Sequence, residues 1–459
     1  MRRVVIAASI YALVLFILGA DKFLTYRSGS DVGLFVQTIA SVTDGFRNTT
    51  EGGNHFTVHF SPILAVCAPF VLATHSALAL VAIAAVATAS TAPPLYAIAR
   101  RHGAGDGVAF FVALAGLSYP PLVGVAFADF HENVFAPAAL IWLIWAFDAG
   151  RYRWAAAFAL TALAVKEDEA IVVAWAALGA AWSCVRRRDR PGFAWSATAI
   201  FASITVFVSY FTIVRPLAGA HAAWSPEHFY DWRRALPANQ TAPAWSPGRL
   251  TYVLEAFAPL LFISLASPFV LLALPGFVEV LASRESVTYT MGQHYAAVWV
   301  GPVLASYAIA TARIARRHPS RGLRLSRLAV AACAAVLVVA SPTHWAHYLG
   351  PRTAHDAALD RVLALLPPDA PVATAEETFA HLGFDRRAVL GVRGDCDYVV
   401  LDTHATRSAL VERDAPLMRV ALAAGRYRQE RDDDGVAVYR LSTPLHKTTT
   451  SCAQRPVTY

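Results

Sequence analysis

Long apolar stretches, interrupted by short polar clusters, follow one another along the chain from residue 4 to about residue 342. Apolar stretches of this length predict helices that cross a membrane. We expect such helices at residues 4–20, 78–99, 107–123, 133–149, 154–165, 169–185, 193–214, 250–266, 268–282, 295–312 and 327–342. The pattern therefore predicts an all-α polytopic transmembrane bundle of about eleven spans.

One further apolar stretch, at residues 63–74, is shorter, with Pro62 before it and Pro69 inside it. Apolar segments of about 10–14 residues are more often re-entrant or interfacial than spanning. We therefore predict that residues 61–76 form a re-entrant or interfacial segment that does not cross the membrane.

Beyond residue 342 the apolar runs become short, and Asp, Glu and Arg become frequent. The change divides the chain into a membrane domain, residues 1–342, and a small α/β domain, residues 343–459, with a flexible tail from about residue 442. Helices are expected at residues 354–366 and 406–424, and strands at residues 372–374, 398–401 and 435–441. The aromatic-rich segment 216–247 is typical of an amphipathic segment lying on the membrane or of a lid over a substrate groove.

Composition agrees with a membrane protein. The chain is 56% hydrophobic and only 15% charged, with a mean hydropathy of +0.44, whereas soluble proteins carry about 25% charged residues. The net charge of +7 comes mostly from arginines in short loops, so it does not indicate nucleic-acid binding. Five cysteines are too few for a disulfide framework, although Cys396 and Cys452 can pair if they face an oxidising compartment.

Loop arginines predict the orientation. They cluster at residues 2–3, 100–101, 151–153, 186–190 and 313–327, and the positive-inside rule places all of these clusters in the cytoplasm. The N-terminus is then cytoplasmic, and its apolar run is an uncleaved first span rather than a signal peptide. The first outside loop covers residues 21–60, the C-terminal domain is extracytoplasmic, and the polar clusters described next all fall on the outer face.

Asp31 follows the first span and opens an amphipathic helix expected at residues 32–42. An aspartate in this place is typical of a helix N-cap. It also suits a general base at the membrane surface, where partial desolvation raises its basicity. The two interpretations are compatible.

Asn54, His55 and His59 form a second cluster. Two histidines four residues apart would share one face of a helix, which suits a metal. Pro62 and the preceding Gly52-Gly53 argue against a continuous helix, and favour hydrogen bonds to a phosphate or a sugar instead. We therefore assign no metal ligand and no cofactor, and a divalent metal stays an alternative.

Two more clusters lie next to spans, where charged groups are candidates for function. His131 and Glu132, preceded by Asp129, exceed what capping a helix requires. His294 and Tyr295 begin a later span, where they suit either an interface anchor or a site.

The last cluster is Lys166, Glu167 and Asp168, which continues into Glu169. Acidic groups at the start of a helix favour its dipole, which explains part of the cluster. Lys166 needs a different explanation. It is well placed to neutralise a lipid phosphate, or to pair with Asp31 or Glu132.

Several motifs together resemble those of a known family. They are Tyr26–Phe35, Gly53–Pro62, Phe127–Glu132, Val165–Asp168, Leu274–Gly276 running on to His294–Tyr295, Leu366–Asp369 and Asp397–Asp402. Their order and spacing resemble, over nearly the whole chain, the polytopic prokaryotic proteins called domain of unknown function 2079. The first motif there more often reads Tyr-Asp-Leu-Gly. Here Ser30 and Val32 replace the tyrosine and leucine, while Asp31 and Gly33 remain.

That family is similar in layout to the C-type glycosyltransferases, membrane enzymes that use polyprenyl-phosphate sugars and place a catalytic aspartate in the first outside loop. The resemblance implies the prokaryotic inner membrane, a polyprenyl-phosphate sugar lipid as partner, and hexosyl or pentosyl transfer to an extracytoplasmic acceptor. The catalytic candidates are Asp31, His131 and Glu132. The substrate-binding candidates are Asn54, His55, His59, Lys166, Glu167, Asp168, His294 and Tyr295.

A transporter or lipid-handling protein without transferase activity is the alternative, because charged residues in membranes also mark ion and substrate paths. The clusters are expected at one membrane face, whereas transport sites lie near the midplane, and the chain shows no inverted repeat. A purely structural role would not explain why the clusters gather on one face.

Overall fold

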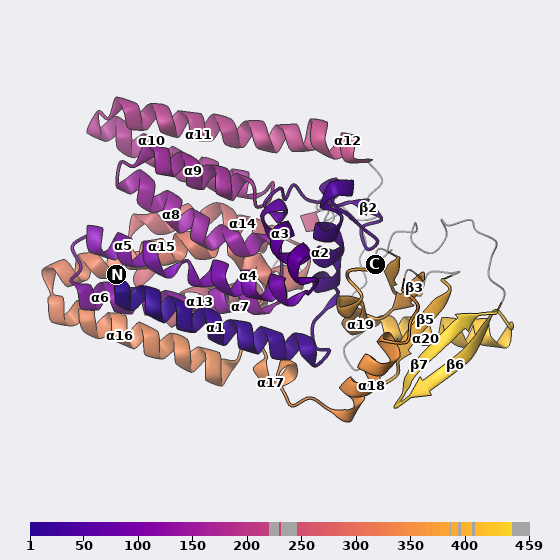
Figure 1. Ribbon diagram of the computed structural model, residues 1–459. Helices are drawn as coiled ribbons and strands as arrows, with labels where there is room; N and C mark the ends of the chain where they lie inside the picture. The colour runs from indigo at the N-terminus through magenta and orange to yellow at the C-terminus, as the bar shows by residue number, and fades with distance from the viewer. Residues whose placement is uncertain are drawn as a thin grey trace.

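The computed structural model describes residues 1–219, 229–230, 246–368, 370–385, 387–392, 396–405 and 409–442. The molecule consists of a bundle of helices with roughly aligned axes and a small sheet domain, which lies at one end of the bundle (Figure 1). The N-terminus lies at the end of the bundle far from the sheet domain (Figure 1).

The bundle and the helices at its polar end comprise α1 (Arg2–Leu24), α2 (Ser30–Ala40), α3 (Leu64–Thr74), α4 (Leu78–Ala89), α5 (Ala92–Arg101), α6 (Asp106–Leu117), α7 (Pro120–Phe127), α8 (Ala136–Asp148), α9 (Tyr152–Leu163), α10 (Glu169–Arg187), α11 (Arg190–Ser209), α12 (Arg215–Gly219), α13 (Pro247–Phe257), α14 (Leu274–Ala282), α15 (Ala297–Arg317), α16 (Pro319–Ala335) and α17 (Trp345–Tyr348). Short 3-10 helices at His55–Thr57, Glu132–Phe135 and His294–Ala296 carry candidate residues.

Helix α15 is the centre of the bundle. Its apolar stretch is 94% buried, and it contacts α8, α16 and α5. By contrast, the apolar stretches of α1, α11 and α16 are only 17% buried and present large apolar side chains such as Leu13, Ile17 and Phe201 outward. An apolar exterior around a buried helix is the arrangement expected of a protein in contact with lipid.

The expected count of about eleven spans is not confirmed. Among the described residues, six helices are long and apolar enough to cross a membrane, or seven if the bent pair α6–α7 is one span. Helix α8 has 13 residues and α9 has 12, lengths of about 18–20 Å against a hydrocarbon core of about 30 Å. Segment 250–266 breaks at Pro259 into 3-10 turns, because proline removes a backbone donor.

The C-terminal part is a five-stranded sheet flanked by helices. Its elements are α18 (Ala354–Leu363), β3 (Val372–Thr374), α19 (Glu376–His381), β4 (Ala388–Leu390), β5 (Tyr398–Asp402), α20 (Ala409–Ala423), β6 (Tyr427–Asp433) and β7 (Val436–Leu441). The strand order is β4-β3-β5-β7-β6, with β3 parallel to β4 and β5 and the remaining pairs antiparallel. A two-stranded ribbon, β1 (Arg47–Asn48) with β2 (Gly53–Asn54), lies in the loop after α2.

Alternation along the strands gives the sheet two apolar faces. On β5, Val400 packs in the cluster that contains Leu359 of α18, whereas Val399 and Leu401 pack in the cluster that contains Met418 of α20. Successive side chains of a strand point to opposite faces. Helices α18 and α20 therefore cover opposite sides of the sheet.

The expected elements of this domain are largely observed, but sequence reasoning missed β4, β6 and α19. The tail beyond residue 442 and most of segment 216–247 lie outside the described residues, as does Cys452. Cys396 is disulfide-bonded. Cys67, Cys184 and Cys333 are buried free thiols.

Helix α2 lies between the bundle and the sheet domain (Figure 1), and α19 packs on it. The Gln37 side chain donates to the backbone carbonyls of Asp385, at 2.8 Å, and Ala388, at 3.0 Å. The His381 ring stacks between those of Phe23 and Tyr26, with centroids 4.2 and 4.0 Å away. The helix that begins with Ser30 and Asp31 is therefore held to the sheet domain by buried polar and aromatic contacts.

The contact requires glycine at position 33. A Cβ atom placed on Gly33 would lie 2.7 Å from both the ring and the carbonyl oxygen of Phe379. We expect Gly33→Ala to cost about 1–3 kcal/mol through overpacking and to lower the thermal unfolding temperature of the purified protein. The matched control is Gly107→Ala, where the new Cβ meets nothing closer than 3.8 Å. Equal unfolding temperatures for the two variants would contradict the close contact.

Candidate functional site

The candidate residues gather where the polar end of the bundle meets the sheet domain. Asp31 comes from the first turn of α2, His131 from the turn before α8, and His294 from the 3-10 helix that leads into α15. Asp31 is not the N-cap of α2, because Gly29 holds that place and makes no side-chain cap hydrogen bond. In the first turn, the Asp31 charge still favours the helix dipole.

Asp31 and His131 form an ion pair, with 3.2 Å between Oδ2 and Nε2. The His131 ring stacks on the His294 ring at a centroid distance of 3.5 Å. Tyr295 follows, with its ring 4.1 Å from that of His294. The Asp31 side chain keeps 45% of its surface exposed, whereas that of His131 keeps 13%. The carboxylate is therefore accessible, and its partner is enclosed.

This pairing changes how both groups titrate. Burial alone would raise the pKa of Asp31, but the charge and hydrogen bond of His131 outweigh it and lower that pKa. Burial alone would lower the pKa of His131, and Asp31 reverses this and raises it. Asp31 is therefore held deprotonated, the form that accepts a proton.

Lys22 and Asp129 form a buried ion pair beside Asp31, with 2.9 Å between Nζ and Oδ1. Asp129 also accepts the Gly29 N–H at 2.9 Å, and Lys22 donates to the Phe127 carbonyl at 3.0 Å. Asp129 takes up a positive φ of 109°, which is uncommon outside glycine. The pair connects the end of α1, the turn after α7 and the backbone that leads into α2.

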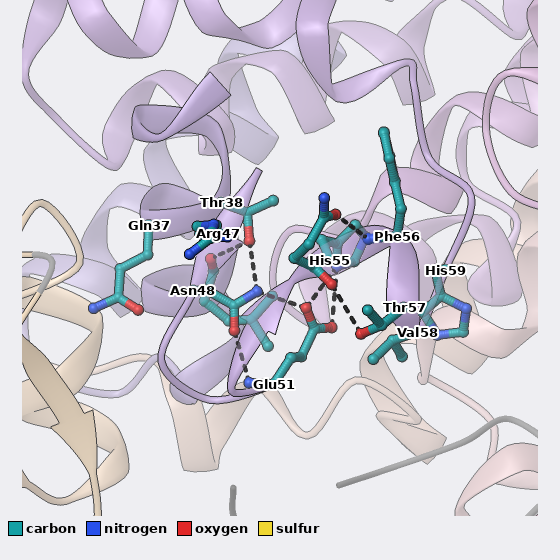
Figure 2. Close-up of polar contacts among 12 residues, drawn as sticks. Gln37, Thr38, Arg47, Asn48, Glu51, His55, Phe56, Thr57, Val58 and His59 are labelled. Carbon is teal, nitrogen blue, oxygen red and sulfur yellow. Dashed lines mark hydrogen bonds and ion pairs between the residues drawn. The ribbon is translucent and has the colours of Figure 1, made fainter. Parts of the chain in front are cut away.

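His55 is held by Glu51 in the loop that contains β1 and β2. Figure 2 shows the Glu51 carboxylate against His55 Nδ1, at 2.9–3.0 Å, and Asn48 bonded to Glu51 on one side and Thr38 on the other. Glu51 raises the pKa of His55 against the opposing effect of burial. Asn54 has a local role, since its side chain caps the 3-10 helix by accepting the Phe56 N–H.

His59 does not share a helix face with His55, because the 3-10 helix ends at Thr57. The two rings lie 6.0 Å apart. His59 Nδ1 is 2.9 Å from Glu167, whose other oxygen accepts the Phe60 N–H at 2.8 Å. Burial, and after it the charge of Lys166, lowers the pKa of His59 to about 3, so this imidazole is neutral at physiological pH.

Lys166 pairs with Asp168, its Nζ lying 2.8 Å from Oδ2, rather than with Asp31 or Glu132. Glu279 of α14 lies within electrostatic range of both Asp168 and Lys166. Burial alone would lower the pKa of Lys166, but the charges of Asp168, Glu167, Glu132 and Glu279 together raise it, which keeps the lysine cationic.

Glu132 links these groups electrostatically. Its side chain is buried, and its Oε2 has no hydrogen-bond partner among the residues that the structure describes. The groups whose charged forms it favours are His55, His59, His131 and Lys166. The three histidines, the lysine and Asp31 therefore belong to one electrostatic unit rather than to separate clusters.

Sequence reasoning missed four members of this region: Lys22, Glu51, Glu279 and Glu376. Lys22 could have been found, since the chain has only three lysines and this one ends the first apolar run. Glu376, on α19 of the sheet domain, has a pKa raised to about 7 by burial first, then by Glu377, Asp31 and Asp129. No local pattern marks it, because only tertiary packing brings it to Asp31.

The arrangement can bind an anion and accept a proton side by side. Lys166 and protonated His131 supply positive charge, and Asp31 supplies an exposed carboxylate. For a divalent cation, Glu51 with His55 and Glu167 with His59 offer oxygen and nitrogen donors. Among the described residues these donors do not form one close-set group of three.

Comparisons with known proteins identify the family and the fold. A family model described as "Predicted membrane protein (DUF2079)" matches residues 25–438. A crystal structure of ArnT from Cupriavidus metallidurans bound to undecaprenyl phosphate superposes with a TM-score of 0.59 at 13% identity, covering 95% of this chain and 97% of that one. The apo structure of the same protein gives a TM-score of 0.57 with the same identity and coverage. At such low identity the likeness is one of fold. No curated protein sequence matches this chain.

The buried Lys22–Asp129 pair yields a stability prediction. Lys22→Met leaves the Asp129 charge buried without its partner, which we expect to cost about 3–5 kcal/mol and to lower the thermal unfolding temperature. The double variant Lys22→Met/Asp129→Asn should recover much of the loss. Arg361→Met is the control, since its ion pair with Asp433 is exposed and exposed pairs contribute little to stability. Equal effects of Lys22→Met and Arg361→Met would refute the anchoring role.

Proposed function

The chain belongs to the DUF2079 family of predicted membrane proteins, and from this premise we propose that it is a membrane glycosyltransferase that moves a sugar from a polyprenyl-phosphate donor to an extracytoplasmic acceptor. The observation that carries the proposal is the exposed Asp31 carboxylate, which forms an ion pair with His131. Tyr295 lies within electrostatic range of both Asp31 and Lys166, so it connects the carboxylate to the cation. The fold shared with ArnT, whose structure holds undecaprenyl phosphate, supports a lipid phosphate as the partner.

In the proposed reaction Asp31 accepts the proton of an acceptor hydroxyl, and the freed oxygen attacks the anomeric carbon of the donor sugar. The bond between that carbon and the phosphate oxygen breaks, so negative charge collects on the leaving lipid phosphate. His131 holds Asp31 in its deprotonated form and in place. A base set in this way accelerates such reactions by about 10²–10⁴-fold.

Lys166 would stabilise the leaving phosphate, together with His131 and His294. Charge that develops in the transition state is stabilised best by groups already fixed in position. Lys166 is fixed by Asp168, and His294 by its stacking on His131. His55 and His59 would contribute hydrogen bonds to the sugar or phosphate.

The proposal places this end of the bundle and the sheet domain outside the prokaryotic inner membrane, with the N-terminus in the cytoplasm. The sheet domain would then help to recognise the acceptor. A transporter is less well supported, because the polar residues gather at one end of the bundle and not at the middle of its spans.

Asp31→Asn tests the base. Purified protein should lose transfer from a panel of undecaprenyl-phosphate sugars to envelope acceptors by about 10²-fold or more, because the amide cannot take the proton. Binding of undecaprenyl phosphate should be retained. Asp106→Asn, an exposed aspartate of the Arg100 pair, is the matched control and should keep full activity. An Asp31→Asn protein that transfers sugar at the wild-type rate would sink the assignment.

His131→Gln tests the Asp31–His131 ion pair through the pH dependence of kcat/KM. Removing the imidazolium leaves burial, which raises the pKa of Asp31, opposed only by the smaller effect of the Lys22 charge, so the acid limb of kcat/KM should move to higher pH. The sign follows because Asp31 acts only when deprotonated and is protonated as the pH falls through its pKa. His131→Arg keeps the charge, and its acid limb should lie below that of the glutamine variant. Identical acid limbs in wild type and His131→Gln would exclude the coupling.

A further inference from the structure

A second polar cluster lies in the sheet domain, away from the site described above. His355 comes from the first turn of α18, Asp402 ends β5, His404 lies in the turn after it, and Asp434 lies in the turn between β6 and β7. One nitrogen or oxygen atom from each of His355, His404 and Asp434 lies within 4.8 Å of the others. Three separate segments of the chain thus bring donor atoms to one point.

The tautomer of His355 determines what this cluster can bind. Its Nε2 lies 3.0 Å from both oxygens of Asp402, so Nε2 carries the proton and donates it to that carboxylate. In neutral imidazole the other nitrogen, Nδ1, is then a lone-pair acceptor. Yet Nδ1 faces further acceptors: the Asp434 carbonyl at 3.0 Å and the Asp434 Oδ2 at 3.2 Å. Such contacts require either a second proton on the ring or a metal ion between Nδ1 and the oxygens.

Two of the three donor separations fit a metal ion in that position. His355 Nδ1 lies 3.3 Å from His404 Nδ1 and 3.2 Å from Asp434 Oδ2. Ligands about 2.0–2.2 Å from a tetrahedral zinc ion are separated from each other by about 3.3–3.5 Å. Two imidazole nitrogens this close share at most one proton, whereas both can bind one cation.

We propose that His355, His404 and Asp434 bind a divalent cation of the zinc type, with Asp402 orienting His355 from behind. A carboxylate on the remote nitrogen of a metal-binding histidine is the usual support in zinc sites. Two neutral imidazoles and a carboxylate suit zinc, whereas magnesium and calcium prefer all-oxygen sites. Asp402 and Asp434 together balance the double positive charge.

Such an ion would fasten the start of α18 to the ends of β5 and β6. Exposure increases from the supporting carboxylate to the outermost ligand: the Asp402 side chain is 8% exposed, that of His355 20% and that of Asp434 50%. The supporting carboxylate is thus inside, and the ion would be reached from solvent. The inference does not depend on the proposed transfer reaction, so the two fail separately.

The alternative is a doubly protonated His355 that bridges Asp402 and Asp434 without metal.

The test uses the full-length protein in detergent, purified with a tag free of histidine, stripped of metal with a chelator and titrated with zinc. Bound zinc is measured by elemental analysis, and cobalt is substituted to record the visible absorption of a tetrahedral site. Wild-type protein should bind one equivalent more zinc than His404→Ala, and the cobalt bands of this site should disappear in that variant.

His404 is exposed, so the alanine variant should unfold at the wild-type temperature while chelator is present, which separates lost binding from lost folding. His318→Ala, an exposed histidine outside the cluster, should retain the wild-type zinc content. Asp402→Asn should weaken zinc affinity by about 10–100-fold. Equal zinc content in wild type and His404→Ala would overturn the proposal and leave the protonated bridge as the explanation.

Discussion

A charge that leaves water at the end of an apolar bundle must meet an opposite charge or hydrogen bonds, and this constraint organises the polar end of the molecule. The Lys22–Asp129 pair shows it most directly. Because Asp129 also binds the Gly29 N–H, the same contact that neutralises Lys22 fixes the backbone entering α2. The position of Asp31 therefore depends on a pair that takes no part in the proposed chemistry.

The remaining charges divide into two kinds. Glu167 joins segments that lie far apart in the sequence, through His59 and the Phe60 N–H, whereas Lys166 is held in place by its neighbour Asp168. Asp31 has a partner too, but it stays open on one side. Buried pairs therefore build a rigid frame in which an accessible carboxylate can act, and the same frame holds the Lys166 cation in place.

Sequence patterns predicted the membrane character, the sheet domain and most of the residues that meet at the polar end, because charges at the ends of apolar runs stand out. The span count of about eleven was not confirmed, since apolar composition does not reveal where Pro259 turns a helix into 3-10 geometry. Partners were harder to predict. Lys166 binds its neighbour Asp168 rather than Asp31, and Glu376 reaches the site only through the docking of α19, a helix that the pattern did not indicate.

The hydrogen bonds of Gln37 have a consequence for how the protein is made. Its partner Ala388 lies 351 residues later in the chain. At about 5–20 residues per second, the ribosome needs roughly 18–70 s to cover that interval. Throughout this time α2 lacks the carbonyls of Asp385 and Ala388, to which the Gln37 amide donates in the finished fold. The helix that carries Asp31 is thus among the first to be synthesised and among the last to reach its final surroundings, so a chain interrupted before the sheet domain has spans but no finished site.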